Sequence, residues 1–361
     1  MGAGYDEDCL SINIWAPATE GEKRPVLVYI YGGAFITGQA NPRNPAHFVR
    51  DGDVVAVTFN YRVGPLGFVN FASLAGGEGL DGNLGLRDQI AALTWVRANI
   101  AAFGGDPDCV TVFGQSAGSV SVSLLMISAA ARGLFHRAIM GSGGPSLLHS
   151  AAMSRHVAAL YAEELAIAGD AANALRAMPV KRLLRAQRAV ARRLPGAIAA
   201  SPWFDGDLLP SSLGAAMTAA HAPMPLLAGT ARDETRLFEL LPGPRQMPQD
   251  RADVARLLRE QAPAQADAIL AAYPATKRGG RALATDATFA INTRHFAERH
   301  AADQPVWFYR LDAGNPLLGA LHGIDCTYFW DFTGPLFAAL SGGPLIGWRK
   351  ALARQIGRAH V

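Results

Sequence analysis

The feature that most constrains the fold is an alternation of short apolar segments with helical ones. Apolar, β-branched segments stand at 25–31, 53–61 and 109–113, and further strand candidates follow at 138–141, 225–229 and 305–310. Between them, 83–103 reads as a helix, because Leu86, Ile90, Leu93, Val96 and Ile100 recur at spacings of three and four. This alternation predicts an α/β fold with a mostly parallel sheet covered by helices on both faces.

The third apolar segment runs directly into Gly114-Gln115-Ser116-Ala117-Gly118, and an apolar helix follows. A strand, Gly-x-Ser-x-Gly and a helix in this order are the context of a nucleophile elbow, a sharp turn that lifts a serine hydroxyl above the sheet. Both flanking positions must be glycine because they lie against backbone. The free N–H groups of the following helix can stabilise a developing oxyanion. We therefore predict Ser116 as a catalytic nucleophile.

The organisation of the chain favours one domain. Its 361 residues, half of them apolar, suffice for a single α/β domain, which we expect to span 1–361. Residues 153–194 read as mainly helical and lie outside the strand–helix alternation. We expect them to form a helical cap insertion over the active site.

Composition excludes several functions. The net charge of +3 and the charged fraction of 17% do not suggest a nucleic-acid partner. No apolar run reaches the length of a membrane span, and no signal peptide is visible, which favours the cytoplasm. The spacing of Cys9, Cys109 and Cys326 fits neither a disulfide framework nor a zinc site, so we expect buried free thiols and leave their redox state open. The sequence leaves the oligomeric state open.

Several ordered motifs resemble the type-B carboxylesterase family, which also contains the cholinesterases. They lie at 7–17, 60–68, 82–89 and 103–118, the last of which includes Ser116. The resemblance implies an α/β-hydrolase fold and a serine esterase that hydrolyses neutral carboxylic esters through an acyl-enzyme. It implies no metal or organic cofactor, and a small-molecule ester as the substrate.

The resemblance also implies the other catalytic residues. The catalytic acid falls on Glu234 and the base on His322, in the chain order Ser, acid, His that the fold requires. The oxyanion-hole N–H groups fall on Gly33, Ala34 and Ala117. Taken without the resemblance, Glu234 could be a surface acid, and His322 is one of nine histidines.

Weaker implications concern the surroundings of this triad. Ser142 resembles a family serine that helps to position the triad, and Gln115 stands where many members have Glu. Gly196 and Ile198 lie in a stretch that lines the acyl pocket in the family. Because this stretch carries no aromatic side chain, we expect a roomy, apolar acyl site.

The chain departs from the family at its two ends, where it looks shortened. One alternative is therefore an incomplete, poorly active fragment, and another is a non-catalytic, cholinesterase-like binding protein. The presence of Ser116, Glu234 and His322 favours the enzyme. Within the enzyme class, carbamates or amides are alternative substrates. The sequence does not name the natural ester or its acyl and alcohol groups.

Overall fold

A computed structural model describes residues 6–18, 21–40, 44–315 and 317–330. The end of the predicted domain, beyond Trp330, lies outside the described residues. The strands are β1 (Ile12–Trp15), β2 (Arg24–Ile30), β3 (Val55–Phe59), β4 (Gly105–Gln115), β5 (Arg137–Gly141), β6 (Leu226–Ala231) and β7 (Val306–Leu311). The longer helices are α3 (Leu84–Asn99), α4 (Ala117–Ile127), α5 (Ala151–Leu165), α7 (Val180–Arg193), α10 (Arg251–Gln261), α11 (Pro263–Ala271), α12 (Lys277–Thr285) and α13 (Ile291–His300). The shorter helices are α1 (Ala46–Gly52), α2 (Pro65–Phe68), α6 (Ala171–Arg176), α8 (Leu213–Thr218), α9 (Arg236–Leu240) and α14 (Cys326–Phe329).

The seven described strands form one sheet in the order β1-β3-β2-β4-β5-β6-β7. Only β1 is antiparallel, to β3, and every other neighbouring pair is parallel. All six predicted strands are present, with ends shifted by a few residues, and the predicted fold class is confirmed. The prediction missed β1, because four half-buried residues at an edge show no apolar run.

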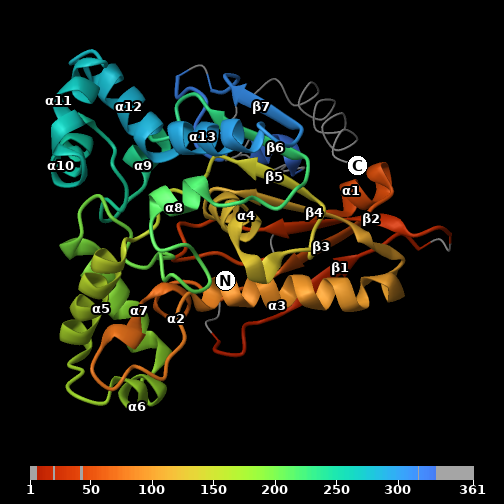
Figure 1. Ribbon diagram of the computed structural model, residues 1–361, viewed down its shortest axis with the longest axis horizontal. Coiled ribbons are helices and arrows are strands. Elements are labelled where there is room, and N and C mark those ends of the chain that lie inside the picture. The colour runs from red at the N-terminus through yellow and green to blue at the C-terminus, as the bar shows by residue number, and fades with distance from the viewer. Residues whose placement is uncertain (1–5, 19–20, 41–43, 316, 331–361) are drawn as a thin grey trace.

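The apolar runs arise because the central strands are covered on both faces. All five residues of β3 are buried, and so are all eleven of α4, which contacts β2, β4 and β5. Helix α3 contacts β4, and α13 contacts β6 and β7. In Figure 1, α3 runs along the lower part of the view, and α13 lies in the upper part beside β6 and β7. No described helix is both long enough and apolar enough to cross a membrane.

Two groups of helices lie beside the sheet rather than on its faces. Figure 1 shows α5–α7 at the lower left and α10–α12 at the upper left, well apart from each other. The first group contains the predicted helices of 153–194. Between α12 and α13 the helix passes through one π-helical turn, Asp286–Ala290. Such turns are rare in proteins, and those that occur often lie at functional sites.

Free thiols were predicted to be buried, and this holds for one of the three. Cys326 is buried, whereas Cys9 and Cys109 are half-buried, and none of the three forms a disulfide in the part of the chain described. The prediction of burial was therefore wrong for Cys9 and Cys109. Cys9 precedes the half-buried edge strand β1, and Cys109 lies within β4 directly before its buried run from Val110.

An ion pair holds the segment after β3 against α3. Asp88 on α3 accepts hydrogen bonds from Nε and Nη2 of Arg62, at 2.8 and 2.6 Å, and from the Arg62 backbone N–H at 2.9 Å. This contact raises the pKa of Arg62. The preceding residue, Tyr61, stacks on Tyr31 with ring centroids 4.3 Å apart, and each hydroxyl donates to the other residue's carbonyl oxygen. The pair therefore braces the loop that begins after Tyr31.

We expect Asp88→Asn to lower the free energy of unfolding by about 2 kcal/mol, because it leaves the Arg62 guanidinium without its buried carboxylate. Urea unfolding followed by tryptophan fluorescence measures this. Glu298→Gln is the matched control, since Glu298 pairs with Arg294 on the exposed surface of α13. Its effect should stay within about 0.5 kcal/mol. Equal effects of the two variants would show that the Arg62–Asp88 pair does not brace the fold.

Candidate active site

Ser116 sits in a strained turn between β4 and α4. Its backbone has φ 60° and ψ −128°, and its N–H donates to the Gly141 carbonyl oxygen at 2.9 Å. A Cβ at Gly114 would lie 2.2 Å from the Gly118 oxygen, and one at Gly118 would lie 2.1 Å from the Ile30 oxygen. Neither approach is sterically possible, so the prediction that both positions require glycine is confirmed. The turn presents the Ser116 hydroxyl at the carboxyl end of the sheet, where α/β proteins bind ligands.

The structure brings His322 and Glu234 to this serine. Nε2 of His322 lies 2.7 Å from Oγ of Ser116, and Nδ1 lies 2.6 Å from Oε2 of Glu234. An ionised carboxylate only accepts hydrogen bonds, so Nδ1 carries the proton and Nε2 is free to accept the serine proton. The other Glu234 oxygen accepts the Ala231 N–H at 2.6 Å. All three side chains are buried.

Two loops at the ends of neighbouring strands carry the acid and the base. Glu234 follows β6, and His322 lies between β7 and α14. Asp233 joins the two loops, because its N–H donates to the Ala320 carbonyl at 2.9 Å and its carboxylate accepts the Ala320 N–H at 3.0 Å. Asp233 therefore holds the histidine loop beside the loop of Glu234.

The three predicted oxyanion donors lie around the same serine. A Cβ at Gly32 would lie 2.9 Å from the Ser116 Cβ, so the loop after β2 rests against the nucleophile turn. Ala34 follows in the left-handed region, with φ 54°, and Ala117 is the first residue of α4. Within the described residues, the N–H groups of Gly33, Ala34 and Ala117 have no hydrogen-bond acceptor. They are therefore available to an anion formed beside Ser116.

Two aromatic rings border the imidazole of His322. The Phe289 ring centroid is 4.4 Å from that of His322, and the Phe238 centroid is 5.2 Å away. Phe289 belongs to the π-helical turn and is fully buried. Neither residue was predicted from the sequence, because nothing local pairs them with a histidine far along the chain.

The two other residues predicted to support the triad lie beside it. Nε2 of Gln115 is 3.5 Å from Nε2 of His322, a distance too long for a strong hydrogen bond. Ser142 is buried with φ 57°, and its N–H donates to Gly229. Its hydroxyl has no hydrogen-bond partner among the residues described.

A second carboxylate, Asp325, lies buried behind the triad. Its Oδ2 accepts a hydrogen bond from the Tyr309 hydroxyl at 3.3 Å, and its Oδ1 accepts the Cys326 N–H at 2.9 Å. Burial, and next the negative charge of Glu234, raise the pKa of Asp325 to about 6. The same surroundings raise the pKa of Tyr309 well above its usual value. The sequence analysis gave Asp325 no role, although it follows His322 by three residues.

A cavity of about 1000 Å³ opens from Ser116 and His322 to the surface. One wall contains Gly33, Ala34 and Ile36, and the opposite wall comes from 237–252 and 276–281. None of the residues from 153 to 194, predicted as the cap, lines it. Gly196 and Ile198 do not line it either. Ile198 packs behind the wall, and the Gly196 N–H donates to the Arg245 carbonyl oxygen at 2.7 Å.

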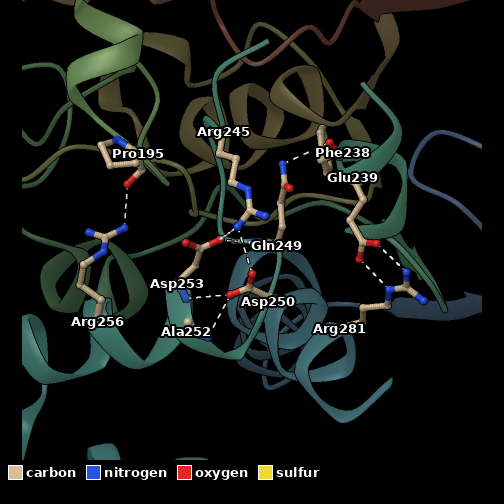
Figure 2. A network of polar contacts seen from close by, with 10 residues as sticks. All are labelled: Pro195, Phe238, Glu239, Arg245, Gln249, Asp250, Ala252, Asp253, Arg256 and Arg281. Carbon is tan, nitrogen blue, oxygen red and sulfur yellow. Dashed lines mark hydrogen bonds and ion pairs between the residues drawn. The ribbon is translucent and has the colours of Figure 1, made fainter. Parts of the chain in front are cut away.

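Ion pairs and hydrogen bonds hold the outer wall together (Figure 2). Glu239 of α9 binds Arg281 of α12 through two contacts of 2.6 and 2.5 Å. Arg245 lies 3.0 Å from Asp250 and 3.3 Å from Asp253. These side chains come from segments with no common periodicity, which is why the sequence did not predict the wall. Among the described residues, no cluster of three His, Cys, Asp or Glu side chains could hold a metal ion.

Comparisons with known proteins identify relatives over most of the chain. The sequence profile described as "Carboxylesterase family" matches residues 2–339. The para-nitrobenzyl esterase of Bacillus subtilis (strain 168) is 36% identical over 85% of this chain and 63% of its own length. The phenmedipham hydrolase of Pseudarthrobacter oxydans is 34% identical over 90% of this chain and 66% of its own. The chain thus spans less than two thirds of the length of these relatives.

Solved structures share the fold. A PNB esterase matches 98% of this chain with a TM-score of 0.87 and 32% identity, and 73% of that chain is covered. A carboxylesterase of Geobacillus stearothermophilus matches 98% of this chain with a TM-score of 0.80 and 32% identity, and 78% of it is covered. The resemblance drawn from the sequence motifs is confirmed at the level of the family and the fold.

Asp325→Asn tests the buried carboxylate through the pH dependence of stability. Because the pKa of Asp325 is raised on folding from 3.8 to about 6, the carboxyl group destabilises the folded state as the pH rises through that range, by up to about 3 kcal/mol at pH 8. The asparagine variant should therefore gain stability relative to wild type, and its advantage should grow by about 1 kcal/mol between pH 5 and pH 8. Urea unfolding of both proteins at the two pH values measures it. A constant difference would show that Asp325 does not titrate in this range.

Proposed function

This chain belongs to the carboxylesterase family, and we propose that it is a serine hydrolase that cleaves neutral carboxylic esters through an acyl-enzyme. The observation that carries the proposal is the hydrogen-bonded chain Ser116–His322–Glu234 at the inner end of the cavity. A hydroxyl, an imidazole and a carboxylate in this order activate a nucleophile. The names of the relatives support an esterase.

The first half of the reaction forms the acyl-enzyme. Nε2 of His322 takes the proton of Ser116 as Oγ attacks the ester carbonyl carbon, and Glu234 stabilises the resulting imidazolium. The N–H groups of Gly33, Ala34 and Ala117 bind the oxyanion of the tetrahedral intermediate, and each such donor contributes about 3 kcal/mol to lowering the barrier. The C–O bond to the alcohol then breaks, and His322 returns its proton to the departing alcohol.

The second half releases the acid. His322 takes a proton from a water molecule, which attacks the acyl carbon, and the same three N–H groups bind the second oxyanion. Breakdown of this intermediate frees the carboxylic acid and returns the proton to Ser116. His322 carries a proton in each half, first from Ser116 to the alcohol and then from water back to Ser116, so its ring must stay aligned with Ser116 throughout. Contact with Phe289 and Phe238 supports that alignment.

Carbamates are the second candidate substrates. A relative that is 34% identical is named phenmedipham hydrolase, and phenmedipham is a carbamate. The same nucleophile and oxyanion donors serve either carbonyl. The acyl group left on Ser116 differs, because a carbamoyl-enzyme is resonance-stabilised and hydrolyses more slowly. Transient accumulation of the intermediate would distinguish a slow carbamate hydrolase from an efficient esterase.

We propose that the α9–α12 region, and not the predicted cap at 153–194, covers the site. Most of residues 237–252 and part of 276–281 line the cavity with the loop after β2 that carries Gly33 and Ala34 (residues 32–37, the oxyanion loop), whereas 153–194 contribute nothing to its lining. The covering element of the site is therefore the α9–α12 region.

Ser116→Ala should lower hydrolysis of p-nitrophenyl acetate by a factor of about 10⁴ to 10⁶, because the nucleophile is lost. Circular dichroism and thermal melting should match wild type. Mass spectrometry after treatment with a phosphonate ester probe should place the label on Ser116, with Ser73→Ala as a control on an exposed serine. A folded Ser116→Ala protein with wild-type activity would locate the nucleophile elsewhere. A wild-type protein that is neither active nor labelled would favour a binding protein or an inactive fragment.

Glu234→Gln should lower kcat about 10³- to 10⁴-fold and leave KM largely unchanged, because the amide favours the wrong tautomer of His322. Asp233→Asn is the matched control, because Asp233 braces the histidine loop without reaching the imidazole. It should cost much less in kcat. Steady-state kinetics on p-nitrophenyl esters compares the two. An unimpaired Glu234→Gln beside an inactive Asp233→Asn would reverse the assignment of the acid.

A further inference from the structure

An apolar cluster lies between the oxyanion loop and the base. Its buried members are Ile198, Met247 and Phe289, and the residues packed against them include Ala34 of the oxyanion loop. The Phe289 ring in turn lies against that of His322 in a tilted contact. An ester whose carbonyl oxygen points at the N–H of Ala34 therefore has this cluster within reach of its acyl or alcohol chain.

Met247 is the member of the cluster that separates it from the cavity. Of the three buried side chains, Met247 alone lines the cavity, although only 3% of it is exposed. Ile198 and Phe289 stand behind the lining. Ile198, which the family resemblance places in the acyl pocket, is thus separated from the cavity by the Met247 side chain, beside Ala34, Ile36 and Phe238, which pack on the cluster and line the cavity.

The backbone that carries Met247 is fixed, whereas its side chain is adaptable. Met247 lies in the rim loop (residues 241–250) between α9 and α10. Figure 2 shows the contacts that hold this loop: Arg245 binds Asp250 and Asp253, and Gln249 Nε2 donates to the Phe238 carbonyl at 3.1 Å. The Arg245 carbonyl oxygen accepts the Gly196 N–H, which ties the loop to the segment before Ile198. Methionine is unbranched and turns about three bonds at small cost.

We propose that Met247 is a side-chain gate of the acyl pocket: acyl chains longer than acetate displace it and lie against Ile198 and Phe289. This rests on the proposed ester hydrolysis. Acetate esters fit without moving the gate, whereas longer chains must turn the methionine away before their methylenes leave water. The gate therefore favours short-chain esters, and the loop backbone keeps its place while the side chain moves.

The test compares kcat/KM for p-nitrophenyl acetate, butyrate and hexanoate. Each further methylene that is buried is worth about a fourfold gain. In Met247→Ala the hexanoate-to-acetate ratio should rise at least about tenfold, with acetate itself changed less than about threefold. Met247→Phe should lower the ratio. Leu240→Ala is the control, because Leu240 is 53% exposed and does not line the cavity. It should leave the ratio unchanged.

A double variant locates the chain behind the gate. Ile198→Phe in the Met247→Ala background should return the ratio towards wild type, because the phenyl ring fills the opened space. A ratio unchanged in both Met247 variants, or a gain in Met247→Ala that Ile198→Phe does not reduce, would overturn the gate while hydrolysis of acetate still supported the esterase. Absence of hydrolysis of all three esters by wild type would instead overturn the proposed function.

Discussion

The site depends on a contact between backbones that no side chain separates. The turn at Ser116 presses against the end of β2, where a Cβ at Gly118 would collide with the Ile30 carbonyl. Gly32, just after β2, meets the same turn at Gln115 and Ser116. The parallel strands β2 and β4 and the first turn of α4 thus come close together. N–H groups from the loop after β2 and from α4 can therefore surround the Ser116 hydroxyl. Any side chain larger than hydrogen at these positions would push the loop after β2 away from the Ser116 hydroxyl.

The local sequence predicted the central strands and the turn at Ser116, and each of these predictions has a physical reason. Strands buried on both faces must be apolar throughout, so β2 to β6 are visible as runs. The elbow is visible because its glycines and its serine are adjacent in the chain. Glu234 and His322 stand in loops with ordinary composition, and only the family resemblance marked them. Their meeting depends on the order of β6 and β7 in the sheet, which no local pattern records.

The outer wall of the cavity could not be predicted from the sequence either, because it also depends on contacts between separate segments. Its contacts join α9 to α12 and the rim loop to α10, through pairs such as Glu239–Arg281. Charged residues on short helices are as typical of a solvated surface as of a wall. The predicted cap at 153–194 illustrates the difficulty: its helical pattern was real, but a helical pattern does not state where in the fold the helices pack. Asp325 was missed likewise, since burial of a carboxylate follows from tertiary packing.

The π-helical turn between α12 and α13 determines which changes of sequence this helix tolerates. A π turn holds more residues than an α turn, so it offsets the angular phase of everything that follows it. Phe289, within the turn, can face His322 while Phe296, seven residues on, packs into the main core with β6 and β7 nearby. The direction in which Phe289 points is therefore not tied to that of Phe296 by the ordinary α-helical repeat. Substitutions along the helix keep the number of residues in the π turn and so keep both directions. Deletion of one residue from Asp286–Ala290 would rotate the helix on one side of the deletion by about 100°, so that Phe289 or Phe296 would lose its partner.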